Sequence, residues 1–153
     1  MAPPKRTPAL SPEFQSLGQE TALTLLRSAD TVRRHFGAVL EPFGITLQQY
    51  NVLRILRKAG GDGLPTLTIV ERMMEKTPGI TRLLDRMERQ DWVSRRRCTD
   101  DRRRVWISLT RKGRELLSQL DGPIDEADEE VVEALSDRQK EQVIRALRRL
   151  LSD

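Results

Sequence analysis

The sequence predicts a mainly α-helical domain that carries one small β-hairpin. Two patterns and the length of the chain support this fold class. Apolar residues recur at three- and four-residue spacing along most of the chain, which is typical of helices that bury one face. Between residues 92 and 109 the spacing falls to two, which indicates strands. The 153 residues are enough for a single domain with its own core.

Two helices are expected near the N-terminal end. A helical apolar stripe begins at Phe14 and stops at residues 42–44, where a proline and a glycine end the helix. The hydroxyl of Thr46 can accept a hydrogen bond from an unpaired backbone N–H, so Thr46 is expected to cap a second helix, which ends at the glycine pair 60–61. Residues 62–65 are predicted to be a connector.

Two shorter helices joined by a tight turn follow. Thr66 or Thr68 is expected to cap a short helix that ends near residue 74. Thr77 and Pro78 are expected to be the cap and first position of the next helix, over residues 77–90, because proline's missing N–H costs nothing there. This pair has the spacing of a helix-turn-helix.

A β-hairpin is predicted directly after this pair. Residues 105–109 alternate between apolar and polar and are expected to form a strand with one buried face. Residues 92–96 can supply the antiparallel partner, and residues 98–102 have the polar composition of a connecting loop. A helix-turn-helix followed by a basic hairpin is the arrangement of a winged helix, which binds DNA.

The C-terminal part predicts two more helices. The apolar stripe after Arg111 keeps its phase across Pro123, so we expect one long helix kinked at this proline, with a break there as the alternative. Ser136 is expected to cap the last helix, with Gln139 at the matching capping-box position. The terminal apolar stripes are longer than one small winged helix can cover, which favours their burial in a twofold dimer.

Charge is distributed unevenly along the chain. Residues 1–75 carry a net charge of +2, residues 76–114 carry +8 and residues 115–153 carry −6, which together give the net charge of +4. The basic middle segment contains the predicted helix-turn-helix and hairpin. Such asymmetry indicates a surface for a polyanion joined to a segment with another role.

Several function classes are excluded by what the sequence lacks. Cys98 and His35 are each the single residue of their type, so neither an internal disulfide nor a common zinc site can form. The sequence has no phosphate-binding glycine loop or nucleophile elbow, so we expect no enzyme activity and no cofactor. It also shows no signal peptide and no apolar run that could span a membrane, so a cytoplasmic protein is expected.

The predicted helix at residues 77–90 and the hairpin carry the candidate polyanion contacts. Outside the apolar stripe of that helix lie Thr81, Arg82, Asp85, Arg86 and Arg89. The hairpin loop is surrounded by Arg95, Arg96, Arg97, Arg102, Arg103 and Arg104. The nearby acids, Asp91, Asp100 and Asp101, are too few to neutralise six arginines. This excess favours a loop that enters a narrow DNA minor groove over a loop whose arginines are solvated or paired with those acids.

Three segments resemble the MarR family of bacterial transcription regulators. Residues 101–110 (DRRRVWISLT) are similar to the family's wing signature, and residues 80–88 (ITRLLDRME) to its recognition helix. Residues 47–53 resemble its second helix. In the turn before the recognition helix, this chain has Met74 and Glu75 where the family often has glycine and leucine.

The resemblance implies a homodimer whose terminal helices interlock and which presents two winged helices to a pseudo-palindromic operator in double-stranded DNA. It implies that Arg103 enters the minor groove and that Asp101 braces the wing by pairing with an arginine. With the helix residues above, the candidate DNA contacts are Thr77, Pro78, Gly79, Thr81, Arg82, Arg86, Arg102 and Arg103.

The predicted organisation is one compact domain with four parts. Residues 1–12 are expected to be a mobile, proline-rich arm. Residues 13–44 are expected to form an N-terminal dimerisation helix, and residues 45–110 the DNA-binding winged helix. Residues 111–153 are expected to supply the C-terminal dimerisation helices.

The resemblance also implies a repressor that a small effector, often an anionic aromatic compound, releases from DNA. The candidate effector residues are His35, Phe36, Phe43, Tyr50 and Arg54. Two alternatives stay open. The chain is a redox-responsive regulator if its neighbouring arginines activate the thiol of Cys98. It is a non-specific architectural DNA-binding protein if it has the basic wing but no effector site.

Overall fold

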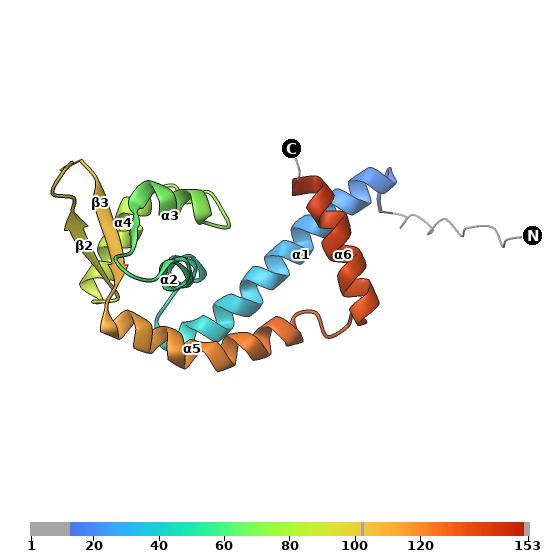
Figure 1. Ribbon diagram of the computed structural model, residues 1–153. Coiled ribbons are helices and arrows are strands. Elements are labelled where there is room, and N and C mark those ends of the chain that lie inside the picture. The colour runs from blue at the N-terminus through green and yellow to red at the C-terminus, as the bar shows by residue number, and fades with distance from the viewer. Residues whose placement is uncertain (1–12, 102, 152–153) are drawn as a thin grey trace, which may run out of the picture.

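The fold is seen in a computed structural model that describes residues 13–101 and 103–151. The predicted arm at residues 1–12 and the candidate DNA contact Arg102 lie outside the described residues. The elements in chain order are α1 (Leu17–Leu40), the 3-10 helix η1 (Glu41–Phe43), α2 (Leu47–Ala59), β1 (Leu64–Pro65), α3 (Thr66–Arg72), α4 (Ile80–Arg89), β2 (Val93–Arg97), β3 (Val105–Leu109), α5 (Arg111–Glu130) and α6 (Asp137–Leu151). The prediction of a mainly helical winged helix is confirmed (Figure 1).

The molecule divides into a winged lobe and a stem (Figure 1). We use "winged lobe" for residues 45–110, which contain α2 to α4 and the sheet, and "stem" for α1 and α6. Helix α5 runs from the lobe towards α6, and α1 lies beside it. The two basic elements, α4 and the β2–β3 hairpin, therefore lie together at the end of the molecule away from α6.

The sheet has three antiparallel strands in the order β1-β3-β2. The hairpin pairs Val93 with Leu109 and Arg97 with Val105, as expected from the alternating pattern. The connector expected at residues 62–65 is partly wrong, because Leu64 pairs with Ile107 as a short third strand. Gly63 allows this close approach, since its φ is +89° and a Cβ there would overlap the carbonyl oxygen of Ile107.

The helix starts in the helix-turn-helix differ from the prediction. Pro65, rather than Thr66 or Thr68, precedes α3, and the Thr66 hydroxyl instead donates to the carbonyl of Val105 at 3.4 Å. Helix α4 begins at Ile80 rather than Thr77, because Gly79 before it has a left-handed φ of +81°. The Thr77 hydroxyl caps nothing and donates to the Glu75 carbonyl at 3.2 Å.

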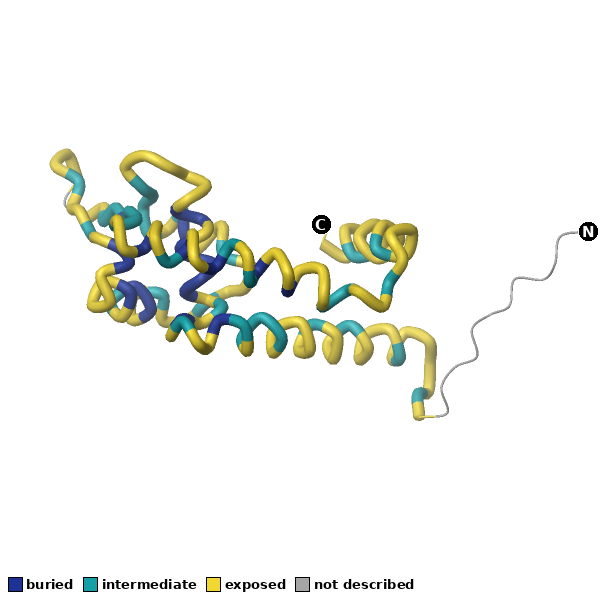
Figure 2. Tube along the Cα trace, turned by 90° about the horizontal axis from the view of Figure 1, so that it is seen from below, coloured by how far each residue is buried: buried dark blue, intermediate teal, exposed yellow. Residues whose placement is uncertain are grey.

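The core of the lobe is built from the faces that the apolar spacing predicted. Val52 and Leu53 of α2, Met87 of α4 and Ile107 of β3 are fully buried, together with Ile69 of α3. In Figure 2 the buried segments cluster in the lobe and along the adjoining half of α5. Thr46 caps α2 with a complete capping box, as predicted. The candidate DNA-binding elements therefore lie on a packed support.

The stem is much more open than the lobe. Helix α5 runs continuously through Pro123, so the expected single helix is present and the alternative of a break there is wrong. The helix ends at Glu130, whereas the expected apolar stripe continues beyond it. Ser136 and Gln139 form the predicted capping box before α6. Helix α6 has no buried residue. It crosses α1 in the view of Figure 1, and Figure 2 draws the two helices apart. In the part of the chain that the structure describes, no helix is both long and apolar enough to cross a membrane.

Candidate DNA-binding surface

Helix α4 turns a basic face to solvent. It buries Leu83, Leu84 and Met87 against the lobe, which leaves the side chains between them exposed. The exposed residues include Thr81, Arg82, Arg86 and Arg89. Among the residues described, no carboxylate lies within 4.0 Å of the three guanidinium groups. These charges are therefore available to an anionic partner, as arginines that read bases or contact phosphates must be.

Arg95 of β2 is turned back onto α4 instead of projecting from the hairpin. Its Nη2 lies 2.6 Å from Asp85 Oδ1, and its Nε lies 3.7 Å from Glu88 Oε2. The same Nη2 donates to the Thr81 carbonyl at 3.3 Å. Arg95 thus neutralises two carboxylates of α4 and fastens the hairpin to that helix.

This role of Arg95 is not visible in the sequence, where the acids nearest to the hairpin arginines are Asp91, Asp100 and Asp101. The true partners lie on the preceding helix, at a separation that follows from how the strand packs on α4. Neither helical nor strand periodicity gives a signal for such a pair.

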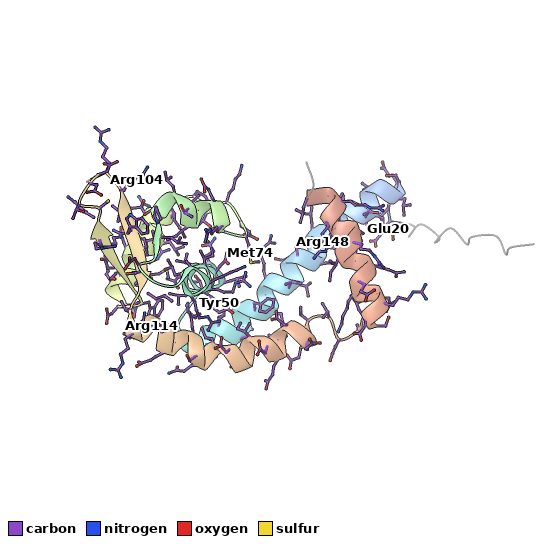
Figure 3. The ribbon with its side chains drawn as sticks, in the orientation of Figure 1. Glu20, Tyr50, Met74, Arg104, Arg114 and Arg148 are labelled. Atoms are coloured by element: carbon purple, nitrogen blue, oxygen red, sulfur yellow. The ribbon has the colours of Figure 1, made fainter. Side chains whose placement is uncertain are left out.

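The tip of the hairpin is fixed by its own backbone and by Asp101. The Arg103 N–H donates to Asp101 Oδ1 and the Arg104 N–H donates to the Asp101 carbonyl, both at 2.9 Å. Arg104 Nε also lies 3.9 Å from Asp101 Oδ2. Figure 3 shows the Arg104 side chain at the outer end of the hairpin. Asp101 therefore contacts two consecutive arginines and holds the loop that presents them.

Most of the described hairpin arginines have no acidic partner. Within residues 13–101 and 103–151, Arg96, Arg97 and Arg103 have no carboxylate within 4.0 Å, and all three are exposed. A narrow projection with uncompensated guanidinium groups matches the negative potential of a DNA minor groove. The hairpin therefore provides a second cationic surface next to α4.

The remaining candidate DNA contacts lie in the turn before α4. Pro78 and Gly79 are exposed, and Thr77 is half-buried. They belong to the turn and not to the first coil of α4, so their backbone and the Thr77 hydroxyl, rather than a helix face, are what they can offer to DNA.

Four of the five candidate effector residues come from α1 and α2, which pack on each other, and the fifth, Phe43, lies in η1. His35 and Phe36 of α1 have their rings edge to face, with centroids 6.1 Å apart. His35 Nε2 lies 3.4 Å from Glu130 Oε2 of α5 but is not hydrogen-bonded to it. Tyr50 of α2 is buried, and burial raises the pKa of its phenol, against the opposing effect of Arg54.

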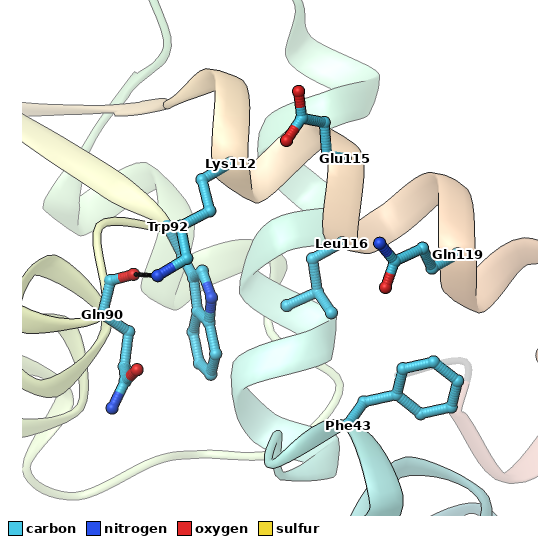
Figure 4. Close-up of a pocket in the computed structure, with 7 residues that line it drawn as sticks. All are labelled: Phe43, Gln90, Trp92, Lys112, Glu115, Leu116 and Gln119. Atoms are coloured by element: carbon cyan, nitrogen blue, oxygen red, sulfur yellow. Dashed lines mark hydrogen bonds between the residues drawn. The ribbon is translucent and has the colours of Figure 1, made fainter.

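Two hollows of the described surface are lined mostly by other residues. One, of about 410 Å³, lies between α5, η1 and the start of β2 (Figure 4). Of the candidate effector residues it includes Phe43 alone, and its lining is Phe43, Gln90, Trp92, Lys112, Glu115, Leu116 and Gln119. The second, of about 330 Å³, lies between α4 and the hairpin and includes Arg95 and Arg97. The structure does not bring His35, Phe36, Tyr50 and Arg54 into either hollow.

Cys98 lies at the start of the hairpin loop. Its side chain is partly exposed and it forms no disulfide. Its backbone N–H donates to the Arg104 carbonyl at 2.9 Å, which places it where the loop leaves β2. Among the described residues there is no group of three or more histidine, cysteine, aspartate or glutamate side chains that could hold a metal ion.

Comparison with known proteins places this surface in a family. The MarR family profile matches residues 45–105, which are most of the winged lobe. The homoprotocatechuate degradative operon repressor of Escherichia coli is 30% identical over 105 residues, which cover 69% of this chain and 70% of the repressor. A MarR transcription factor from Planctomyces limnophilus is 35% identical with a TM-score of 0.70, covering 88% of this chain and 98% of that one. Staphylococcus aureus MepR, solved in complex with DNA, is 28% identical with a TM-score of 0.75, covering 86% and 95%. The chain belongs to the MarR family of transcriptional regulators.

Proposed function

We propose that this protein is a sequence-specific repressor that binds a pseudo-palindromic operator as a homodimer and leaves it when a small effector binds. The observation that carries the proposal is the pair of adjacent cationic surfaces. Helix α4 offers Arg82 and Arg86, which have no acidic partner among the described residues, and the hairpin beside it offers Arg103 in a loop held by Asp101. The family relationship supports it, because one relative is an operon repressor and another was solved bound to DNA.

Each surface has a distinct role in this proposal. Arg82 and Arg86, with Thr81, lie in the major groove, where arginine pairs with guanine and threonine contacts a thymine methyl or a phosphate. Thr77, Pro78 and Gly79 approach the phosphate backbone from the turn before α4. Arg103 and Arg102 enter the adjacent minor groove, and Asp101 orients the loop.

The exposed apolar side chains of the stem support the homodimer. Leu26 of α1 is 67% exposed, and Ile144 and Leu151 of α6 are 48% and 82% exposed. Further apolar residues are exposed on the same two helices, namely Leu17, Leu23, Val32, Val143 and Leu150. Soluble monomers rarely expose large apolar patches, whereas a twofold interface buries the same residues on both copies.

The test of sequence-specific binding begins with a selection. Duplexes are selected from a random pool by the purified full-length protein, and the Kd for the best palindrome is compared with that for unrelated DNA at fixed salt. A regulator prefers the palindrome by about a thousandfold or more. A ratio near one would instead indicate a non-specific architectural protein.

Two substitutions separate the roles of the wing and the helix. Arg103→Ala is expected to weaken binding without lowering Tm, whereas Arg111→Ala, which removes an equal charge from an exposed ion pair outside the wing, has a smaller effect. Arg82→Ala is expected to reduce discrimination between operator and unrelated DNA. An equal loss on all sequences would show that Arg82 contacts phosphate, and unchanged affinity of Arg103→Ala would remove the minor-groove contact.

For the effector, we propose a small aromatic carboxylate bound where α1 meets α2, by His35, Phe36, Tyr50 and Arg54. The support is the chemistry of these groups: two aromatic rings in contact, a phenol, and an exposed guanidinium. Benzoate and homoprotocatechuate are suitable probes, the second because of the related operon repressor. Release of DNA by either compound, lost in Arg54→Met, would support the site. Release by peroxide that is lost in Cys98→Ser would favour the redox alternative.

A further inference from the structure

The turn between α3 and α4, residues 73–79, is tied to the stem by an ion pair. Arg33 Nε of α1 donates to Glu75 Oε1 at 2.6 Å, although the two residues are 42 positions apart. Glu75 is one of the residues at which this chain differs from the common MarR pattern. The pair therefore joins α1 to the segment that leads directly into α4.

Two methionines of the same turn are held by α2. Met74 Sδ accepts a weak hydrogen bond from Arg54 Nη2 at 3.8 Å, and Met73 Sδ accepts one from Asn51 Nδ2 at 3.7 Å. Figure 3 shows Met74 on the side of the winged lobe that faces α1. The turn is thus anchored from within the lobe by α2 and from outside it by α1.

The other polar contacts described for residues 27–40 do not reach the helix-turn-helix. Arg34 pairs with Asp30 in its own helix, and His35 faces Glu130 of α5. The Arg33 and Glu75 side chains are 50% and 49% exposed, so their pairing contributes little to the stability of the fold. The pair does, however, join α1 directly to the turn that leads into α4.

We propose that the Arg33–Glu75 ion pair is a positioning contact that sets the angle of α4 to the stem and so the half-site spacing that the dimer accepts. The inference rests on the proposed function. In a twofold dimer the stem defines the symmetry axis, so a rotation of the lobe about its junction with the stem changes the separation of the two α4 helices. That separation must match half-sites about one helical turn of DNA apart.

The experiment measures tolerance to operator spacing. The selected palindrome is prepared as such and with one base pair inserted at its centre, which moves the half-sites by about 3.4 Å and rotates them by about 34°. The readout is the Kd for the operator with the insertion divided by the Kd for the original palindrome, measured at fixed salt with the full-length protein. For Arg33→Ala and for Glu75→Ala we expect this ratio to fall about three- to tenfold, because an exposed pair lost from each protomer weakens the restraint by that order. Tm should stay within about 2 °C of the parent value.

Arg34→Ala is the matched control, because it removes the same charge from the neighbouring residue and breaks a pair that lies within α1. The charge exchange Arg33→Glu with Glu75→Arg is expected to restore the parent ratio. Equal ratios for Arg33→Ala and Arg34→Ala, or no restoration in the exchanged protein, would overturn the inference. Failure of the proposed function looks different, since the selection would then yield no preferred palindrome.

Discussion

The winged lobe and the stem differ in how far their apolar residues are buried. In the lobe, Ile69, Met87 and Ile107 are 0% exposed, and a single core joins helices and sheet. In the stem, Leu40 is the one buried residue that the structure describes in α1, and α6 has none. The core of the lobe also takes in Leu40 of α1 and Leu117 and Leu120 of α5, so the lobe and the adjoining helix ends pack within one chain. In α1 and α6, by contrast, large apolar side chains such as Leu26 and Leu151 are left exposed among the residues described. The proposed dimer would cover them.

The largest effect should come from placing a charge on the stem. Leu26→Glu puts a carboxylate on an apolar face that we propose is buried in both copies, where burial of leucine is worth about 2 kcal/mol per side chain and an unpaired charge is costly. We expect monomers in sedimentation equilibrium at micromolar concentration. Operator affinity should fall by about 100-fold or more, because the two half-sites are then bound independently.

Leu67→Glu is the control for this substitution. Leu67 of α3 is 76% exposed, so Leu67→Glu makes the same substitution at an exposed position of the lobe. This variant should remain dimeric, and circular dichroism should show a folded lobe in both proteins. A dimer that persists in Leu26→Glu would mean that α1 is not the interface and that the exposed face of the stem needs another explanation.

The next largest effect, on the free energy of unfolding, is expected from substituting one of two glycines of α5. A Cβ at Gly113 would overlap the carbonyl oxygen of Trp92, where α5 packs on the lobe, whereas a Cβ at Gly122 would meet nothing within 4 Å. Gly113→Ala should therefore lower the free energy of unfolding by about 2–3 kcal/mol, as overpacking does, and Tm by about 5–10 °C. Gly122→Ala should leave it unchanged or raise it by up to about 1 kcal/mol, because alanine is the better helix former. Thermal unfolding distinguishes them, and equal Tm values would show that the start of α5 is not tightly packed.

The parts of the fold that could be predicted are those whose sequence signals are local. Amphipathic spacing and caps are local, so the α2 cap at Thr46, the α6 cap at Ser136 and the β2–β3 hairpin follow from the sequence. The start of α4 was misplaced because the left-handed backbone at Gly79 competes with the Thr77-Pro78 signal. The strand at Leu64 was missed because two residues carry no periodicity, and its pairing partner is distant in the chain.

The candidate site was predictable to the extent that its residues act singly. Arg82 and Arg86 could be identified because they lie opposite the apolar stripe of α4. Pairs formed across elements could not, and Arg95 and Arg33 are the examples. Each joins residues whose proximity depends on how two elements pack, so their roles become visible only in three dimensions.

The smallest effect is expected for the coupling energies of two ion pairs, one between elements of the lobe and one within α1 of the stem. Arg95→Ala leaves Asp85 and Glu88 of α4 without their shared cation, and the Arg95 side chain is only 27% exposed. Arg34→Ala breaks a pair between successive turns of α1 that is 72% and 62% exposed. Double-mutant cycles in urea unfolding should give a coupling of about 1 kcal/mol for Arg95 with Asp85, and of about 0.3 kcal/mol for Arg34 with Asp30. Because Arg95 also holds the hairpin against α4, its loss should reduce operator affinity, and Asp85→Asn should restore part of that loss by removing a carboxylate of α4 that Arg95 no longer neutralises. Equal couplings would mean that Arg95 is one more solvated surface charge, and that the lobe presents α4 and the wing to DNA without this connection.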